Sequence, residues 1–435
     1  MQLLFDPKRL FNHKSVQNFI SLGFIQVSNI FISLISIPLI INAIEIDEFG
    51  HVNLSLSIIM LLNVFVNYGF HLSGPREVAL NANDKFQLGT IFFKNTFSRF
   101  FLASAICLLI LMLTRFTSAF EHYEIILLLS TILLFSEALF PSWFAQGLER
   151  MPGISVANLC SKIIYLSLIL IAIKKPEDSK WVNFSMGISA LTVNTILIGY
   201  IVIKWNIPFI QPRLKDIFIS LKRNFLLFSS ALISHISISS GVIILSFFAS
   251  KTELGLYGLA ERIMFVLRMF PVLIIQSIYP NASKLYQQNR DAFYVFLRKV
   301  YLSTIGASLV ISVSTTLLAP WIIFLLSGEF RDEAAKILRL LALIPFLASL
   351  NIANMILVLV SGSNKLLFRA TSISTILMLT ICISLTWLYA GTGLAIGIII
   401  TEILIFIIQL KLNLSALTNE TRNFYKHTFS SHYSG

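Results

Sequence analysis

Three ionisable side chains share one apolar stretch of the chain, near residues 256–280. They are Glu261, Arg262 and Arg268. Charged groups inside a membrane helix are costly, so each of them usually faces a partner, water or a substrate. Glu261 and Arg268 are seven positions apart and lie on nearly one helix face, whereas Arg262 points elsewhere. Two roles are open for Arg268: it balances Glu261, or it binds an anionic substrate.

Two further carboxylates and one histidine lie inside other apolar stretches. Glu137 and Glu402 are far from the nearest connection, so each is a counter-ion to an arginine on another helix or a carrier of protons or cations. His235 is either a hydrogen-bonded interior residue or a proton relay. These charge-balancing or coupling candidates complement the arginines.

Other polar residues of the apolar stretches have simpler interpretations. Arg99, Lys162 and Arg339 are close enough to predicted helix ends for their charged tips to reach the lipid headgroups. Carboxamides in the first two stretches can line a wet cavity or hydrogen-bond between helices; they are Gln26, Asn29, Asn63 and Asn67. The pattern from Gly393 to Gly397 is typical of close helix packing.

The composition indicates which elements hold these residues. Hydrophobic residues make up 56% of the chain and charged residues 12%, and the mean hydropathy is +0.82. So much apolar surface requires lipid as its solvent. The net charge of +12 forms no contiguous patch, which argues against a nucleic-acid partner. The three cysteines lie in apolar stretches, and no sequence motif for a metal, a cofactor or an enzyme is present.

A membrane helix needs about 20 apolar residues to cross about 30 Å of hydrocarbon. This criterion predicts an all-α integral membrane protein with about twelve spans, in two six-helix bundles at 1–215 and 216–435. The predicted spans are 19–42, 52–70, 93–113, 125–145, 154–173, 182–203, 225–248, 256–280, 300–325, 337–360, 368–389 and 392–411. The segment 70–92 has room for an interfacial helix, and the connections are too short for a soluble catalytic domain.

The distribution of Lys and Arg predicts the orientation. These residues concentrate in alternate connections, and the strongest concentration is at 204–224, as cytoplasmic loops require. Both termini are therefore expected in the cytoplasm, and the start from Met1 to Lys14 does not read as a removable signal peptide. The five tryptophans, Trp143 among them, fall near predicted span ends, where headgroup-level rings are common.

The two predicted bundles show a weak repeat. Asn18 and Phe19 open the first span as Asn224 and Phe225 open the seventh, and the acidic turn at 45–50 has a counterpart at 253–258. Repeated halves commonly flank the substrate path of a transporter.

Three segments, taken in order, resemble the Wzx-type flippases of O-antigen and polysaccharide export, in the multidrug/oligosaccharidyl-lipid/polysaccharide (MOP) exporter superfamily. The first is the run from Pro38 to Gly50. The second is Asn-Tyr-Gly-Phe-His-Leu-Ser-Gly-Pro-Arg-Glu-Val-Ala at 67–79, and the third is Pro-Ser-Trp-Phe-Ala-Gln-Gly-Leu-Glu-Arg-Met at 141–151. With the length, the spans and the repeat, the likeness covers nearly the whole chain.

This resemblance implies two six-helix bundles around a cationic cavity that opens alternately to each side of a bacterial inner membrane. The implied cargo is an undecaprenyl-diphosphate-linked oligosaccharide, carried from the cytoplasmic to the periplasmic leaflet without a cofactor. Arg262 and Arg268 would then contact the diphosphate. Membrane lipids and a polysaccharide polymerase are the further partners that it implies.

Two other functions remain open. A multidrug or cation antiporter of the same superfamily would need carboxylates in its first spans, and the first two predicted spans contain none. A membrane glycan polymerase or ligase would need a long periplasmic loop, and every predicted outer loop is short. A flippase therefore fits the sequence best.

Overall fold

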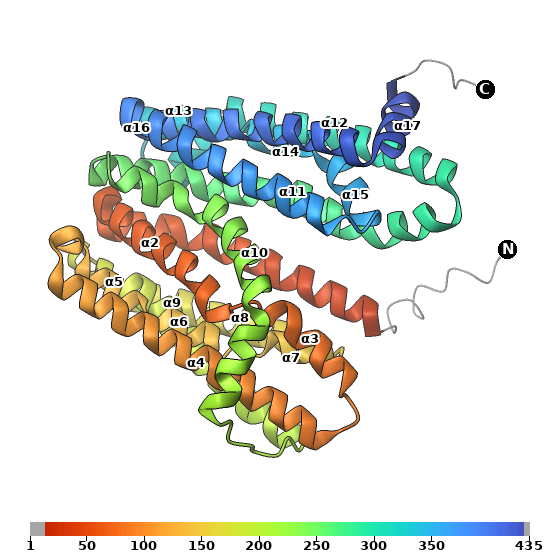
Figure 1. The fold of residues 1–435 in the computed structure, drawn as a ribbon. Helices are drawn as coiled ribbons and strands as arrows, with labels where there is room; N and C mark the ends of the chain where they lie inside the picture. The colour runs from red at the N-terminus through yellow and green to blue at the C-terminus, as the bar shows by residue number, and fades with distance from the viewer. Residues whose placement is uncertain (1–13, 430–435) are drawn as a thin grey trace. The chain divides into compact units, whose positions relative to one another are not determined.

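The computed structural model describes residues 14–429, which form helices and short connections without a strand among them (Figure 1). Ten stretches within this range are long and apolar enough to cross a membrane. The chain is therefore an all-helical protein with multiple candidate membrane spans, as the composition predicted. The expectation that the first residues are not a signal peptide concerns residues 1–13, which lie outside the described range.

Two of the ten stretches are about twice as long as a bilayer requires. They contain 58 and 52 residues and correspond mainly to α2 (Lys14–Asn67) and α16 (Asn364–Ala416). Each of these helices folds back on itself (Figure 1). The reversals coincide with non-helical backbone at Glu45, with φ 66° and ψ 168°, and at Ala390, with φ 46°. Each long element therefore consists of two arms.

The structure divides into two compact units, residues 1–240 and residues 241–435, and each is described by itself. The predicted bundle boundary at residue 215 falls at the start of α10 (Leu214–Ser246), an unbroken helix whose residues up to Ser240 belong to the first unit. The division into 1–215 and 216–435 remains a prediction about the bundles.

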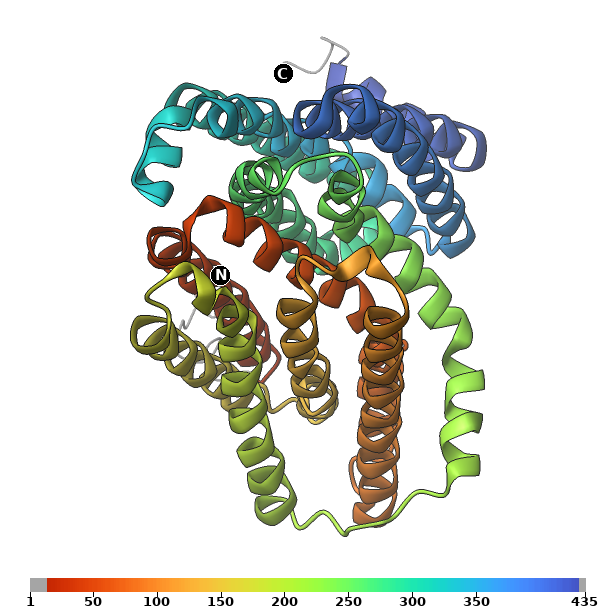
Figure 2. The same cartoon turned by 90° about the vertical axis from the view of Figure 1, so that its left-hand side faces the viewer.

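Unit 1 is built on α2 and eight further helices. These are α3 (Phe70–Leu80), α4 (Lys85–Phe116), α5 (Glu124–Ser130), α6 (Ile132–Ala138), α7 (Ser142–Gly147), α8 (Pro152–Ala172), α9 (Lys180–Lys204) and the first part of α10. The helix α3 occupies the segment where an interfacial helix was considered. Helix α8 packs between α2 and α9, and the extended connection from α9 to α10 passes the end of α4 (Figure 2).

An aromatic cluster forms one core of unit 1, and it corrects one prediction. Trp143 was expected at the headgroup level, but only 3% of it is exposed, and it packs with Phe92 and Phe144. Its ring lies so close to Gly74 that a Cβ there would be 2.6 Å from the ring. Trp143 is therefore a packing residue between α3 and α7, because glycine leaves room for its ring.

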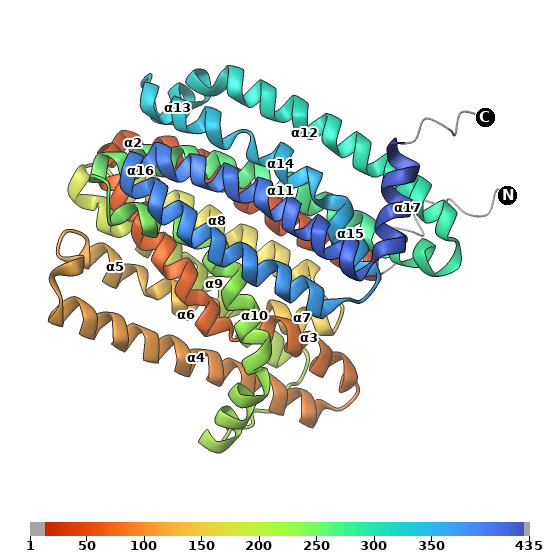
Figure 3. The same cartoon turned by 45° about the horizontal axis from the view of Figure 1, so that its top comes forward.

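Unit 2 contains the end of α10 and seven helices. These are α11 (Lys251–Gln288), α12 (Arg290–Ser327), α13 (Asp332–Leu341), α14 (Ile344–Leu350), α15 (Ile352–Val360), α16 and α17 (Thr418–Phe429). The helices α13, α14 and α15 follow one another along α12 (Figure 3). A reciprocal cap opens α11: the Ser250 hydroxyl accepts from the Glu253 amide at 3.3 Å, and the Ser250 amide donates to the Glu253 carboxylate at 3.0 Å.

The two arms of α16 meet at the predicted small-residue pattern. A Cβ on Gly393 would lie 1.9 Å from the Leu385 carbonyl oxygen, and one on Gly397 would lie 3.1 Å from the Cys382 sulfur. Both glycines therefore permit the close approach of the arms, which confirms the packing interpretation.

Candidate functional site

The structure brings two of the predicted site residues together in unit 2. The Arg268 guanidinium on α11 donates to the Glu402 carboxylate on α16 at 2.5 Å. The Glu402 side chain is 7% exposed, whereas that of Arg268 is 30% exposed. The carboxylate is thus enclosed and the guanidinium keeps an open side, which leaves donors for a second anion.

The neighbouring candidates of α11 have different surroundings. Glu261 is 4% exposed and faces α10, where a Cβ on Gly241 would lie 3.3 Å from its carboxylate oxygen. Tyr257, one turn earlier, is also fully enclosed. Arg262 is half-buried. That Glu261 and Arg268 share a helix face remains a prediction, and Arg268 forms its ion pair with Glu402 of α16.

A second arginine–carboxylate pair lies in unit 1. Arg99 on α4 approaches the Glu137 carboxylate on α6 at 3.3 Å, and the Arg99 side chain is 2% exposed. Asn67, at the end of α2, joins both groups: its amide nitrogen donates to Glu137 at 3.1 Å, and its oxygen accepts from Arg99 at 2.9 Å. Glu137 therefore has an arginine on another helix as its neighbour.

Arg99 also donates hydrogen bonds to backbone carbonyls at a break between two helices. In a continuous helix the carbonyl of Glu137 would accept from the amide of residue 141, but Pro141 has no N–H. Arg99 donates to that carbonyl, and to the carbonyl of Phe140 at 3.0 Å. The expectation that Arg99 reaches the headgroups is wrong, because the break between α6 and α7 supplies it with acceptors inside the bundle.

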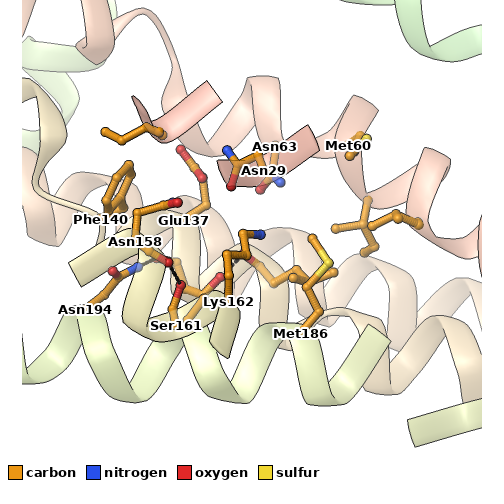
Figure 4. Close-up of a pocket in the computed structure, with 16 residues that line it drawn as sticks. Asn29, Met60, Asn63, Glu137, Phe140, Asn158, Ser161, Lys162, Met186 and Asn194 are labelled. Carbon is orange, nitrogen blue, oxygen red and sulfur yellow. Dashed lines mark hydrogen bonds between the residues drawn. The ribbon is translucent and has the colours of Figure 1, made fainter. Parts of the chain in front are cut away.

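A cavity of about 250 Å³ lies beside this pair, between α2, α6, α8 and α9 (Figure 4). Its polar wall consists of Ser136, Ser161, Asn29, Asn63, Asn158, Asn194, Glu137 and Lys162. The Lys162 side chain extends into the cavity, toward the side where Asn29 and Asn63 lie (Figure 4). Lys162 is the middle residue of α8, so the expectation that it reaches the headgroups is wrong as well. The expectation of a wet cavity lined by carboxamides matches Asn29 and Asn63.

The remaining histidine candidate belongs to the surroundings of Glu137. His235 on α10 is exposed, as is His71 on α3. Both histidines interact electrostatically with Glu137, and His71 also with His235. The structure therefore places His235 near the ionisable groups of unit 1. Its predicted role as a relay remains a prediction.

A third ionic cluster joins α3, α4 and α10. The Glu77 carboxylate lies 3.1 Å from Arg223 and 3.6 Å from Lys94. One turn further along α10, Phe228 stacks on Tyr68 with ring centres 4.3 Å apart. These contacts fasten the first part of α10 to unit 1.

The sequence segments at 67–79 and 141–151 meet in unit 1. A Cβ on Gly147 would lie 2.6 Å from the Cβ of Val78 and 2.7 Å from the Pro75 carbonyl oxygen. The glycine at 147 is thus required by the approach of α7 to α3. Arg99, outside both segments, bonds to Asn67 in the first and lies beside Pro141 in the second.

From the sequence we expected Arg99 and Lys162 at the headgroups and therefore missed their positions inside the bundle. A signal for Arg99 existed in the order Glu137 to Pro141, which leaves one carbonyl without its helical donor. For Lys162 the signal was its distance from both ends of a span. Among residues 14–429, no cluster of His, Cys, Asp and Glu could hold a metal ion.

Comparison with known proteins gives the same fold along nearly the whole chain. An inward-facing multidrug-resistance MATE transporter of the MOP superfamily superposes with a TM-score of 0.73, over 93% of this chain and 99% of that one, at 13% identity. The lipid II flippase MurJ, in an inward closed conformation, has a TM-score of 0.68 over 97% and 94% of the two chains, also at 13% identity.

Curated relatives are more similar in sequence. A protein of Shigella dysenteriae named "Putative O-antigen transporter" is 27% identical over 404 residues, which are 91% of this chain and 99% of the relative. A protein of the same name from Escherichia coli (strain K12) is 25% identical over 89% and 94% of the two chains. The profile of the polysaccharide biosynthesis protein family matches residues 15–286. The chain therefore belongs to the polysaccharide biosynthesis protein family and has the fold of the MOP-superfamily transporters.

Proposed function

We propose that this protein is a flippase for an undecaprenyl-diphosphate-linked oligosaccharide, an O-antigen or related repeat unit. It would carry this lipid from the cytoplasmic to the periplasmic leaflet of a bacterial inner membrane by alternating access. The observation that carries the proposal is the near full-length similarity to relatives named as O-antigen transporters. The fold shared with the lipid II flippase MurJ supports it, because that protein also handles a lipid-linked glycan.

The geometry of the Arg268–Glu402 pair supports the proposed cargo. A diphosphate carries charge that hydrocarbon excludes, so a carrier must supply cationic donors within the membrane. The open side of Arg268 can donate to phosphate in a forked geometry while Glu402 keeps its own contact. We propose Arg268 as the diphosphate contact, with Arg262 as a second cationic residue of the same helix.

We further propose twelve crossings with both termini in the cytoplasm. Eight of the ten stretches would cross once, and the two that fold back, in α2 and α16, would cross twice. The basic connection at 204–224 would then be cytoplasmic. A cytoplasmic reporter fused at residue 215 or at the carboxyl end should be active, and periplasmic alkaline phosphatase activity at either position would contradict this orientation.

The flippase function is tested by deletion of the gene in its host. We expect lipid-linked single repeat units to accumulate on the cytoplasmic side, and surface glycan to return when the gene is restored. If long lipid-linked polymers or unchanged surface glycan were found instead, the proposal would be wrong. A polymerase partner would act after this step.

The role of Arg268 is tested by three variants in the same strain. Arg268→Ala should abolish surface glycan at normal protein abundance, and Arg268→Lys should restore part of it, because lysine offers only a point charge. The double variant Arg268→Met with Glu402→Gln removes both charges of the pair. If the pair only balances itself, this variant should transport normally, and that outcome would refute the cargo contact. Arg339→Ala, at an exposed arginine of α13, is the control.

A further inference from the structure

The cavity beside Lys162 has room for several water molecules. Its volume of about 250 Å³ is below the ~300–1,000 Å³ that drug-sized ligands occupy. Water fills about 30 Å³ per molecule, so the space holds about eight waters. A small hydrated group is therefore the natural occupant.

Lys162 places its ammonium in this space without a fixed partner. It is the middle residue of α8, about 15 Å from either end at 1.5 Å per residue. Among residues 14–429, no hydrogen bond or ion pair holds the Lys162 ammonium. The carboxylate that acts on it electrostatically is that of Glu137, which Arg99 and Asn67 already engage.

The cavity wall also contains acceptors that lack donors. The side-chain oxygens of Asn29, Asn63 and Asn158 are buried and have no hydrogen-bond partner in the described structure. An ammonium group has three donors and no acceptor. These oxygens can therefore support a charged Lys162 directly or through cavity water, whereas the apolar helices around them favour the neutral amine.

The other titratable and charged groups near Lys162 come from several helices. Glu137 is the other titratable residue of the cavity wall. On α8 no other side chain is charged, and α9 carries Lys180 and Lys204 at its two ends. On α2 the ionisable residues beyond its first turn are near the fold-back: Glu45, Asp47, Glu48 and His51. The exposed His71 on α3 and His235 on α10 both interact electrostatically with Glu137.

We propose that Lys162 is a proton-binding site of unit 1, whose ammonium gives a proton to a cavity water and later recovers it during the transport cycle. The coupling to transport rests on the proposed flippase function. In the release step the N–H bond breaks, its electron pair stays on the amine, and the proton forms hydronium. Lysine suits this exchange, because a guanidinium does not lose its proton in proteins.

Two substitutions separate a proton site from a simple positive charge. Lys162→Arg keeps the charge permanently, and Lys162→Met keeps an apolar chain of similar length without charge. Purified protein would be reconstituted in vesicles with a fluorescently labelled undecaprenyl-diphosphate-linked oligosaccharide, and lipid movement would be measured with and without a pH gradient. For wild type, one pH unit should change the rate up to about tenfold, because it changes the ratio of charged to neutral amine by ten.

Both variants should reach the membrane at normal abundance and lose this response. Lys204→Arg and Lys204→Met, at the end of α9, should retain it. If Lys162→Arg responds to the gradient as wild type does, the residue supplies only charge and the proposal is wrong.

A titration keeps the test independent of flippase activity. Difference titration of purified wild type against Lys162→Met and Lys162→Arg should show one exchangeable proton per molecule that both variants lack. If wild type moves no labelled lipid, the flippase proposal fails, while the titration still decides the proton site. Absence of that proton would overturn the Lys162 proposal.

Discussion

The strongest structural prediction concerns Arg99, the enclosed arginine of unit 1. Its guanidinium donates to four acceptors: two backbone carbonyls, the Asn67 oxygen and the Glu137 carboxylate. Arg99→Ala would leave Glu137 without its cationic partner and the carbonyls beside Pro141 without a side-chain donor. Glu137, the charge left behind, is 34% exposed, so the cost is mainly that of the lost hydrogen bonds, about 1–3 kcal/mol. At about 2–4 °C per kcal/mol for a unit of this size, Tm should fall by roughly 2–12 °C.

The assay is thermal unfolding in detergent, followed by fluorescence-detected size exclusion, together with membrane abundance. Arg99→Lys should lose less than Arg99→Ala, because lysine keeps the charge and donates to fewer acceptors. The double variant Arg99→Met with Glu137→Gln should recover only part of the loss, since the side-chain hydrogen bonds to the Glu137 and Phe140 carbonyls stay lost. Arg115→Ala, at an exposed arginine in the last turn of α4, is the control. If Arg99→Ala unfolds at the same temperature as this control, Arg99 does not stabilise the break between α6 and α7.

Three other substitutions are expected to have measurable effects. Glu45→Gly should raise Tm, because the Glu45 backbone has a conformation that costs a non-glycine residue about 1–3 kcal/mol, whereas Glu45→Ala should bring no such gain. Gly147→Ala should cost about 1–3 kcal/mol by crowding Val78, whereas Gly153→Ala, with open space around it, should be tolerated; equal Tm values would contradict this packing. Glu137→Gln should preserve abundance better than Glu402→Gln, because a glutamine oxygen at 137 still has two side-chain donors, Asn67 and Arg99, whereas the more enclosed site at 402 offers Arg268. Immunoblots of membranes that show the reverse order would contradict this expectation.

The sequence predicted a helical membrane protein because an apolar run of about 20 residues is the length that a membrane-spanning helix requires. The predicted spans 368–389 and 392–411 also placed a break in the chain where α16 folds back. The turn expected at 45–50 coincides with the reversal of α2 at Glu45, but the sequence did not predict that this reversal would need only one non-helical residue. Nor did it predict α17, because the polar segment Thr418–Phe429 lacks the apolar run by which spans were recognised.

The sequence could not show which charged residues form ion pairs with one another. Spacing along one helix made Glu261 the natural neighbour of Arg268, but the paired carboxylate comes from Glu402, 134 positions later. In the same way, depth alone could not show whether Lys162 and Arg99 reach headgroups or point inward, because helix rotation sets the direction of a side chain. The carboxamides were more informative, since Asn29 and Asn63 had few roles other than a polar cavity or an interhelical bond.

The two arginine–glutamate pairs differ in which member is enclosed, and this difference divides their proposed roles. In unit 1 the Arg99 side chain is 2% exposed and Glu137 is 34% exposed; in unit 2 Arg268 is 30% exposed and Glu402 is 7% exposed. An arginine that also donates to backbone carbonyls cannot turn to a new anion without giving up those hydrogen bonds, so Arg99 is suited to anchor a broken helix. An arginine with an open side can accept a second anion while it keeps its carboxylate. Binding and release of the diphosphate during transport are therefore better assigned to Arg268 in unit 2. The cavity of unit 1 is suited to the proton that we propose on Lys162.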